Sequence, residues 1–168
     1  MSTLKVNEIQ DTSGVVRRGI QTYAIICDQK SQNTHGGTAT FGAWRTRDLN
    51  TEIADPDDIV SIASNQFTLG AGTYLIEAQA PGYRVHYNQL RLYNATTSSS
   101  VQTGISMYTD PSYNTYVIGT VAARVTITGN TTFEIQHQVY QTIASYGFGI
   151  AANYDSEVYT IVKIYKEA

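Results

Sequence analysis

The sequence predicts an all-β protein built as an antiparallel β-sandwich. Residues 66–93 carry the clearest signal, because polar and apolar side chains alternate there with the two-residue period of half-buried strands. Turn-forming residues interrupt this alternation at 70–72 and 81–82, where we expect the chain to leave one strand and begin the next. Charged residues make up only 15% of the chain, well below the roughly 25% of ordinary soluble domains, which favours β-structure over helix.

The length and charge of the chain limit the classes of protein to which it can belong. With 168 residues it can form one domain with a sizeable core and a short terminal segment. A net charge of −3 provides no basic surface, so we expect no nucleic-acid partner. No apolar run approaches the roughly 18 residues of a membrane span, so we expect no membrane insertion. The first residues lack the apolar centre of a signal peptide, which predicts synthesis in a cytoplasm.

Residues 1–20 are predicted to form an extended N-terminal arm, and residues 21–168 the folded domain. The arm contains too few apolar residues to fold by itself. It is therefore either a frayed terminus or a docking segment that a partner protein orders. The residues assigned to docking are Leu4, Val6, Ile9, Arg17 and Arg18.

The domain is expected to place strands on both sides of the central block. These strands lie at 22–27, 41–47, 51–53, 101–108, 117–128, 132–143 and 157–166. Cys27, the single cysteine, is expected to be buried in the first strand. Trp44 is expected in the core, with an exposed contact as the alternative. Gly129 and Asn130 predict a tight β-hairpin. The carboxylates at 55–58 predict a capped turn, with calcium binding as the alternative.

Phe67, Gly72 and Tyr74 carry a resemblance to a known family. Their spacing follows a Phe-x-Leu-x-x-Gly-x-Tyr pattern ahead of a long alternating strand. This pattern resembles the middle of the jelly-roll domain shared by complement globular heads and tumour necrosis factor-like trimers. The resemblance covers roughly residues 22–166 and implies jelly-roll topology. Residues 2–14 are similar to the start of many bacteriophage tail-fibre chains, in which such a segment precedes a distal domain.

The last predicted strand, 157–166, is apolar on both faces. Within an isolated sandwich only one face of a strand needs to be apolar, and the family resemblance implies a threefold contact through the sheet that contains the first and last strands. We therefore expect a homotrimer. The residues assigned to its interface are Tyr159, Ile161 and Tyr165.

The motifs of enzymes and metal sites were not found in the sequence. His35, His86 and His137 lie far apart and share no metal-ligand spacing, so we expect no catalytic residues, no metal and no cofactor. His137 lies in an apolar stretch and is expected to be a hydrogen-bonded core or interface histidine.

Surface recognition is the remaining class of function. Thirteen tyrosines give the chain an unusual supply of side chains that combine large contact area with low entropic cost. Tyrosines flanked by amides and carboxylates in the loop at 108–116 suit sugar rings, although packing is the commoner role for any single tyrosine. The candidate ligand contacts are Tyr108, Asp110, Tyr113, Asn114 and Tyr116.

These observations together predict a non-enzymatic virion structural protein. It would be a bacteriophage fibre module that attaches to the host surface by recognising a glycan or a protein, with residues 1–20 bound to another virion protein. The alternative is a trimeric capsid decoration protein that docks to the shell through the same arm.

Overall fold

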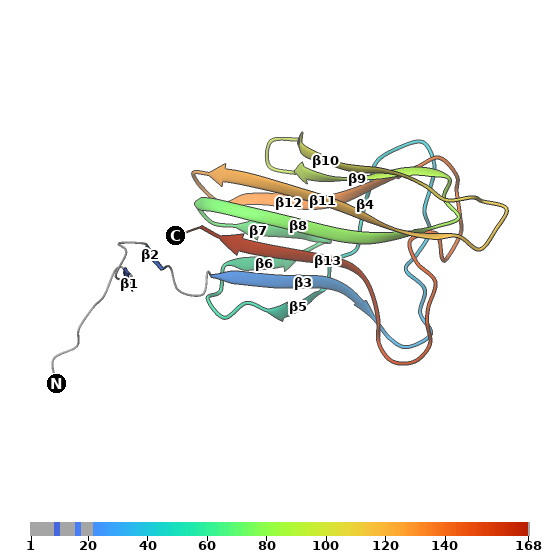
Figure 1. The fold of residues 1–168 in the computed structure, drawn as a ribbon, viewed down its shortest axis with the longest axis horizontal. Coiled ribbons are helices and arrows are strands. Elements are labelled where there is room, and N and C mark those ends of the chain that lie inside the picture. The colour runs from blue at the N-terminus through green and yellow to red at the C-terminus, as the bar shows by residue number, and fades with distance from the viewer. Residues whose placement is uncertain (1–8, 11–15, 18–21, 168) are drawn as a thin grey trace.

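The computed structural model describes residues 9–10, 16–17 and 22–167 of the chain. Residues 22–167 form two antiparallel β-sheets packed face to face, and the described residues contain no helix (Figure 1). The predicted all-β sandwich is therefore confirmed. Its strands are β3 (Tyr23–Lys30), β4 (Arg45–Thr46), β5 (Thr51–Ala54), β6 (Val60–Ala63), β7 (Gln66–Leu69), β8 (Gly72–Tyr83), β9 (Tyr87–Asn94), β10 (Ser99–Tyr108), β11 (Tyr116–Ile127), β12 (Thr131–Val139) and β13 (Glu157–Lys166).

The two sheets have the strand order of a jelly roll. One is six-stranded, in the order β10-β9-β12-β7-β6, with β4 paired to the remaining part of β12. The other is five-stranded, in the order β11-β8-β13-β3-β5. Consecutive strands repeatedly lie in different sheets, because β8 and β11 belong to the five-stranded sheet while β7, β9, β10 and β12 belong to the other. The first and last strands of the sandwich, β3 and β13, are neighbours in one sheet.

The hairpin predicted at Gly129 and Asn130 is wrong. β11 pairs along its whole length with β8, and β12 lies between β9 and β7. The turn therefore carries the chain from one sheet to the other. The apolar faces of β11 and β12 both contribute to the cluster that fills the space between the sheets, so they line the same core from opposite sheets.

The turn at Pro81 and Gly82 also differs from the prediction, because β8 continues to Tyr83. Gln79 is the last residue of β8 that pairs with β13, so the missing N–H of Pro81 interrupts no ladder on that side. The chain instead bends just after the strand, where Arg84 and His86 have φ values of 58° and 65°.

The core between the sheets is a single large apolar cluster. Phe67 of β7 and Phe133 of β12 stack with their ring centroids 5.7 Å apart. Tyr74 and Ile76 of β8 join the same cluster from the opposite sheet. Cys27 is fully buried, as expected. The predicted strand at 41–47 is mostly loop, with only β4 as regular structure.

The two ends of the sandwich differ in character (Figure 1). β3 begins and β13 finishes at one end, where Tyr23 pairs with Tyr165. Long loops lie at the opposite end, here called the distal end. These distal loops are residues 31–44, 84–86, 109–115 and 140–156.

Part of the predicted arm forms a separate pair of short strands. β1 (Ile9–Gln10) pairs antiparallel with β2 (Val16–Arg17). Of the residues assigned to docking, Leu4, Val6 and Arg18 lie outside the described residues, and the docking role of the arm stays a prediction.

Among the residues that the structure describes, no helix is long and apolar enough to cross a membrane.

Candidate binding surfaces

The outward face of the five-stranded sheet is the first candidate contact surface. Val162 and Ile164 on β13 are fully buried in the core. The alternate residues Ile161, Lys163 and Tyr165 therefore point away from the core, and they are half-buried. Pairing places further outward side chains beside them on β8, β3 and β11. The apolar side chains of this face are Tyr23, Ile25, Leu75, Ile118, Ile161 and Tyr165.

The middle of the outward face of the six-stranded sheet is polar and forms its own hydrogen bonds. Nε of Arg91 donates to Oε1 of Gln136 at 2.7 Å, and Gln136 in turn donates to Glu134. The Arg91 guanidinium also lies 4.3 Å from the ring centroid of Trp44 and 4.7 Å from that of Tyr93. Trp44 is thus half-buried on this outward face, so the core position predicted for it is wrong.

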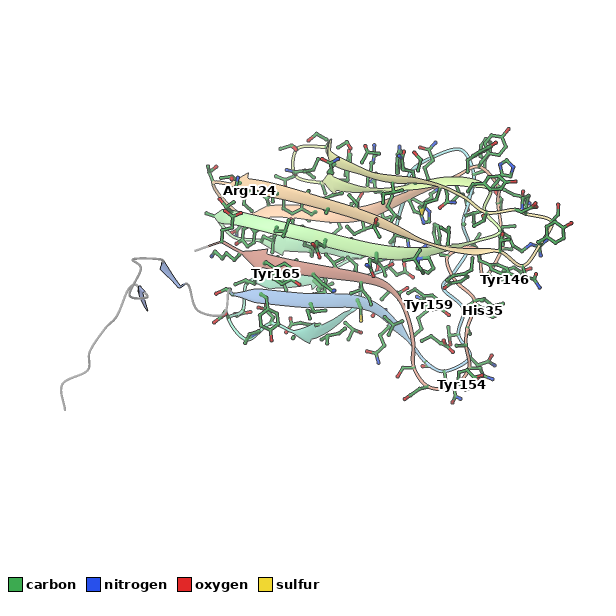
Figure 2. The ribbon with its side chains drawn as sticks, viewed as in Figure 1. His35, Arg124, Tyr146, Tyr154, Tyr159 and Tyr165 are labelled. Atoms are coloured by element: carbon green, nitrogen blue, oxygen red, sulfur yellow. The ribbon has the colours of Figure 1, made fainter. Side chains whose placement is uncertain are left out.

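Tyr159 does not lie on the free face expected of an interface residue. It is 6% exposed, and its hydroxyl donates to the carbonyl oxygen of Thr34 at 2.7 Å. Its ring packs so closely against Gly149 that a Cβ there would lie 2.2 Å from Cδ1. Burial raises the pKa of Tyr159. Tyr159 therefore holds the distal loops within its own subunit, at the opposite end of β13 from Tyr165 (Figure 2). The interface assignments of Ile161 and Tyr165 stay predictions.

The carboxylate of Glu157, at the start of β13, organises the same loops. It accepts the backbone N–H groups of Asn153 at 2.7 Å, Ala152 at 3.0 Å and Asn33 at 3.3 Å. These bonds favour the ionised form and lower the pKa of Glu157.

The loop predicted to contact a ligand uses two of its polar residues internally. Oδ1 of Asp110 accepts the N–H of Ser112 at 2.8 Å, and Oδ1 of Asn114 accepts the hydroxyl of Tyr83 at 2.7 Å. Tyr113 is 69% exposed on this loop. Tyr116 lies near Tyr83 at the start of β11, and burial raises its pKa. The role of these residues in binding stays a prediction.

Tyr108 belongs to a different group, a row of three tyrosines across neighbouring strands. Tyr108 pairs with Tyr87 in the β10–β9 ladder, and the N–H of Tyr140 donates to the carbonyl of Tyr87 at 2.9 Å. The His86 ring lies against all three, with centroid distances of 4.4, 5.1 and 5.1 Å to Tyr87, Tyr108 and Tyr140. Each of the three tyrosines is more than half exposed. We call Tyr87, Tyr108 and Tyr140 the tyrosine row.

A groove runs beside the tyrosine row on the outward side of the six-stranded sheet. Its volume is about 430 Å³. Phe41 extends the aromatic wall, with its ring 5.5 Å from that of Tyr140. Amide side chains of Gln89 and Gln138, the next outward pair along β9 and β12, line the groove beyond the rings. Sequence reasoning identified only Tyr108, because the other aromatic residues come from three separate segments that pair only in the folded sheet.

The interior below the distal loops contains ionisable groups that serve the fold. Arg47 is fully buried, and burial lowers its pKa to about 10 despite the nearby carboxylates. His137 is also fully buried and shares a 3.0 Å hydrogen bond with Oδ1 of Asn88, which confirms its expected core position. Burial first, and the charge of Arg47 second, lower the pKa of His137 well below its usual range. His137 is therefore neutral at physiological pH.

The acidic and histidine side chains of the described residues do not gather into a metal-binding cluster. Residues 9–10, 16–17 and 22–167 contain no cluster of three or more His, Cys, Asp or Glu side chains able to hold a metal ion. The carboxylate of Asp55 accepts the N–H groups of Ile59 and Val60 at 2.9 and 2.8 Å, so it caps the turn as predicted.

Comparison of the fold with solved structures agrees with the jelly-roll assignment. The globular domain of zebrafish complement 1qA superposes with a TM-score of 0.56 at 13% identity, covering 88% of this chain and 98% of that domain. The fold is that of complement C1q and tumour necrosis factor domains. Eiger TNF from S. frugiperda gives a TM-score of 0.58 at 12% identity, covering 88% and 93% of the two chains. Murine APRIL gives 0.52 at 6% identity, covering 85% and 98%.

Sequence comparison adds no relative to these structural neighbours. No protein-family model matches the chain, and no curated protein matches it. At such low identities, the structural neighbours show that this chain has a jelly-roll fold, and they do not show its function.

Proposed function

We propose that this protein is a non-enzymatic attachment module that works as a self-associated assembly. One observation carries the proposal, namely the contrast between the two outward sheet faces. The five-stranded sheet presents a band of half-buried apolar side chains around Tyr165, whereas the polar side chains in the middle of the six-stranded sheet hydrogen-bond to one another, and its exposed tyrosines lie beside the distal loops. An apolar sheet face bordered by polar groups is typical of a surface that contacts another protein.

The contact is proposed to join three copies of the chain. Tyr165 pairs with Leu75 on one side and Tyr23 on the other, which forms a continuous apolar band across three strands. Ile161 lies farther along the same outward face of β13. The resemblance to trimeric jelly rolls through Phe67, Gly72 and Tyr74 favours three subunits over two.

The assembly is proposed to belong to a virion, as a bacteriophage fibre module. This part of the proposal rests on the similarity of residues 2–14 to tail-fibre chains. The arm would bind another virion protein. The distal loops lie at the end of the sandwich away from the start of β3, so an arm-bound module would present them outward to a host surface (Figure 1).

Light scattering of the purified chain tests the self-association. We expect a mass near three times 18.5 kDa for the natural protein and a monomer for the double variant Ile161→Lys/Tyr165→Lys. Lysines on this face would bury uncompensated charge in the interface. Tyr93→Lys, a half-buried outward tyrosine on the opposite sheet, is the matched control and should remain a trimer. A natural protein that is monomeric at every concentration tested would refute the proposal.

A capsid decoration protein is the second candidate function. It is favoured by the short connection between arm and sandwich, since β2 ends at Arg17 and β3 begins at Tyr23, which leaves little chain for a fibre shaft. Competition distinguishes the two candidates. Added protein should block adsorption of the parent phage if it is a fibre module, and should leave adsorption unchanged if it covers the capsid.

A further inference from the structure

We propose that the groove beside the tyrosine row binds an uncharged saccharide. This inference rests on the attachment function proposed above, and it specifies where the ligand binds and which chemical class it belongs to. The site shares Tyr108 with the loop at 108–116 that the sequence indicated, and otherwise lies outside that loop.

The tyrosine row offers flat, preorganised stacking surfaces. Tyr87 begins β9, Tyr108 ends β10 and Tyr140 directly follows β12, and all three rings contact His86. Their exposed fractions are 60%, 52% and 60%. Exposed aromatic rings in one cluster are unusual in a soluble domain and mark a contact site. A sugar ring presents a face of polarised C–H groups, which suits the negative face of an aromatic ring.

The polar part of the groove lies directly next to the rings. Gln89 and Gln138 form the neighbouring outward pair on β9 and β12, and Ser106 follows on β10. Nε2 of Gln89 donates to Oγ of Ser106 at 3.0 Å, which orders its amide. Amides and hydroxyls both donate and accept hydrogen bonds, as sugar hydroxyls do. A ring that stacks on the tyrosines would therefore place its hydroxyls beside matching groups.

The charge of the groove selects among possible ligands. Its lining contains aromatic, aliphatic, amide and hydroxyl side chains and no Asp, Glu, Lys or Arg. The nearest guanidinium, that of Arg91 beside Trp44, already donates to Gln136, so a phosphorylated or acidic ligand would find no cation among the lining residues, and a basic ligand no anion. The volume of about 430 Å³ lies within the range of small-ligand sites. These features fit a short neutral oligosaccharide.

The groove would remain accessible in the proposed assembly. Gln89, Gln138 and Tyr140 are on the outward face of the six-stranded sheet, whereas the apolar band around Tyr165 is on the other sheet. Binding of saccharide and contact between subunits therefore use opposite faces.

Titration of the full-length protein with defined trisaccharides tests the inference. Trp44 is the single tryptophan and lines the groove, so its fluorescence reports binding there. The probes are maltotriose, triacetylchitotriose and galactotriose as neutral ligands, with trigalacturonate as the acidic control. We expect saturable binding of at least one neutral probe. Absence of binding of every neutral probe up to about 10 mM, or tighter binding of trigalacturonate, would overturn the inference.

Variants locate the site. Tyr87→Ala and Tyr140→Ala should each weaken binding about tenfold, the loss expected for one aromatic contact. Tyr113→Ala and Tyr154→Ala remove more exposed tyrosines outside the groove and should bind like the natural protein. Loss of binding in Tyr113→Ala, with binding kept in Tyr87→Ala, would show that the saccharide binds at the 109–115 loop and would refute the assignment of the site to the groove.

Two further measurements distinguish a loss of saccharide binding from a loss of folding or of self-association. Tyr140→Phe should keep binding and Tyr140→Leu should weaken it, with circular dichroism unchanged in both. If both bind equally, the ring does not carry the contact. The mass of each sample by light scattering tests self-association independently. A monomer that binds saccharide would refute the proposed assembly alone, and a trimer that binds no neutral probe would refute the groove alone.

Discussion

Arg47 links the two sheets and the distal loops through a single buried side chain. Its guanidinium donates to Oγ1 of Thr160 at 3.1 Å, the carbonyl of Pro81 at 3.3 Å and the carbonyl of Phe148 at 2.9 Å. The Phe148 ring lies 4.1 Å from it. Its charge is balanced at longer range, chiefly by Asp28. The desolvation of such a charge is tolerated because these acceptors and the nearby carboxylate compensate for it.

Replacing Arg47 should therefore cost far more than replacing an exposed arginine. We expect Arg47→Met to lower the free energy of unfolding by about 3–5 kcal/mol, because it leaves the buried carbonyls of Pro81 and Phe148 without the donor that Arg47 supplies. The measurement is urea denaturation followed by circular dichroism. Arg124→Met is the matched control, since Arg124 forms a solvent-exposed ion pair with Glu167 at 2.7 Å and its loss should leave stability nearly unchanged. Equal losses in the two variants would contradict this assignment.

At the scale of elements, the edge where β10 meets β11 closes the sandwich. These strands belong to different sheets and approach closely at Gly104, where a Cβ would lie 2.2 Å from the carbonyl oxygen of Thr120. The backbone of Thr120 cannot move aside for an added Cβ as a flexible side chain could. Glycine is therefore required at this position for the two sheets to meet.

The variant Gly104→Ala should open this edge. We expect a loss of about 1–3 kcal/mol in the free energy of unfolding, typical of overpacking a tight contact. Gly129→Ala is the control, because a Cβ there meets nothing within 4 Å, and its effect should stay within about 0.5 kcal/mol. Thermal denaturation of both variants, compared with the natural protein, provides the measurement. A Gly104→Ala protein as stable as Gly129→Ala would contradict the requirement for glycine where β10 meets β11.

At the scale of the whole molecule, the strands of the sandwich supply the residues of its main apolar core. The main apolar cluster draws on residues from Ala24 on β3 to Ile164 on β13, within the described residues. Because the core of the sandwich draws on β3 to β13, we propose that the sandwich provides assembly and recognition, and that the arm provides docking.

A chain that begins at Thr22 should keep both the fold and the oligomeric state. We expect its thermal midpoint to lie within about 4 °C of that of the full chain, because the main core is intact. Calorimetry and light scattering on the two proteins provide the test. A larger fall in midpoint, or a change from trimer to monomer, would assign the arm to the assembly itself.

The sequence determined the local part of this structure. Alternation of polar and apolar residues reports that one face of a strand is buried, so the strands of the central block and the all-β class were predictable. The Phe67, Gly72 and Tyr74 pattern also led to the correct topology. In the same way, His137 and Cys27 were correctly expected in buried strand positions.

Tertiary structure alone decided which strands pair and which residues meet. Alternation gives no partner for a strand, and so the turn at 129–130 looked like a hairpin although it crosses between sheets. Alternation along the last strand placed Tyr159 on an outward face, yet loops from distant segments cover its side chain. The tyrosine row arises because the β9–β10 and β9–β12 registers align side chains that are far apart in the chain. Such contacts are non-local, and only the packing of the two sheets sets them.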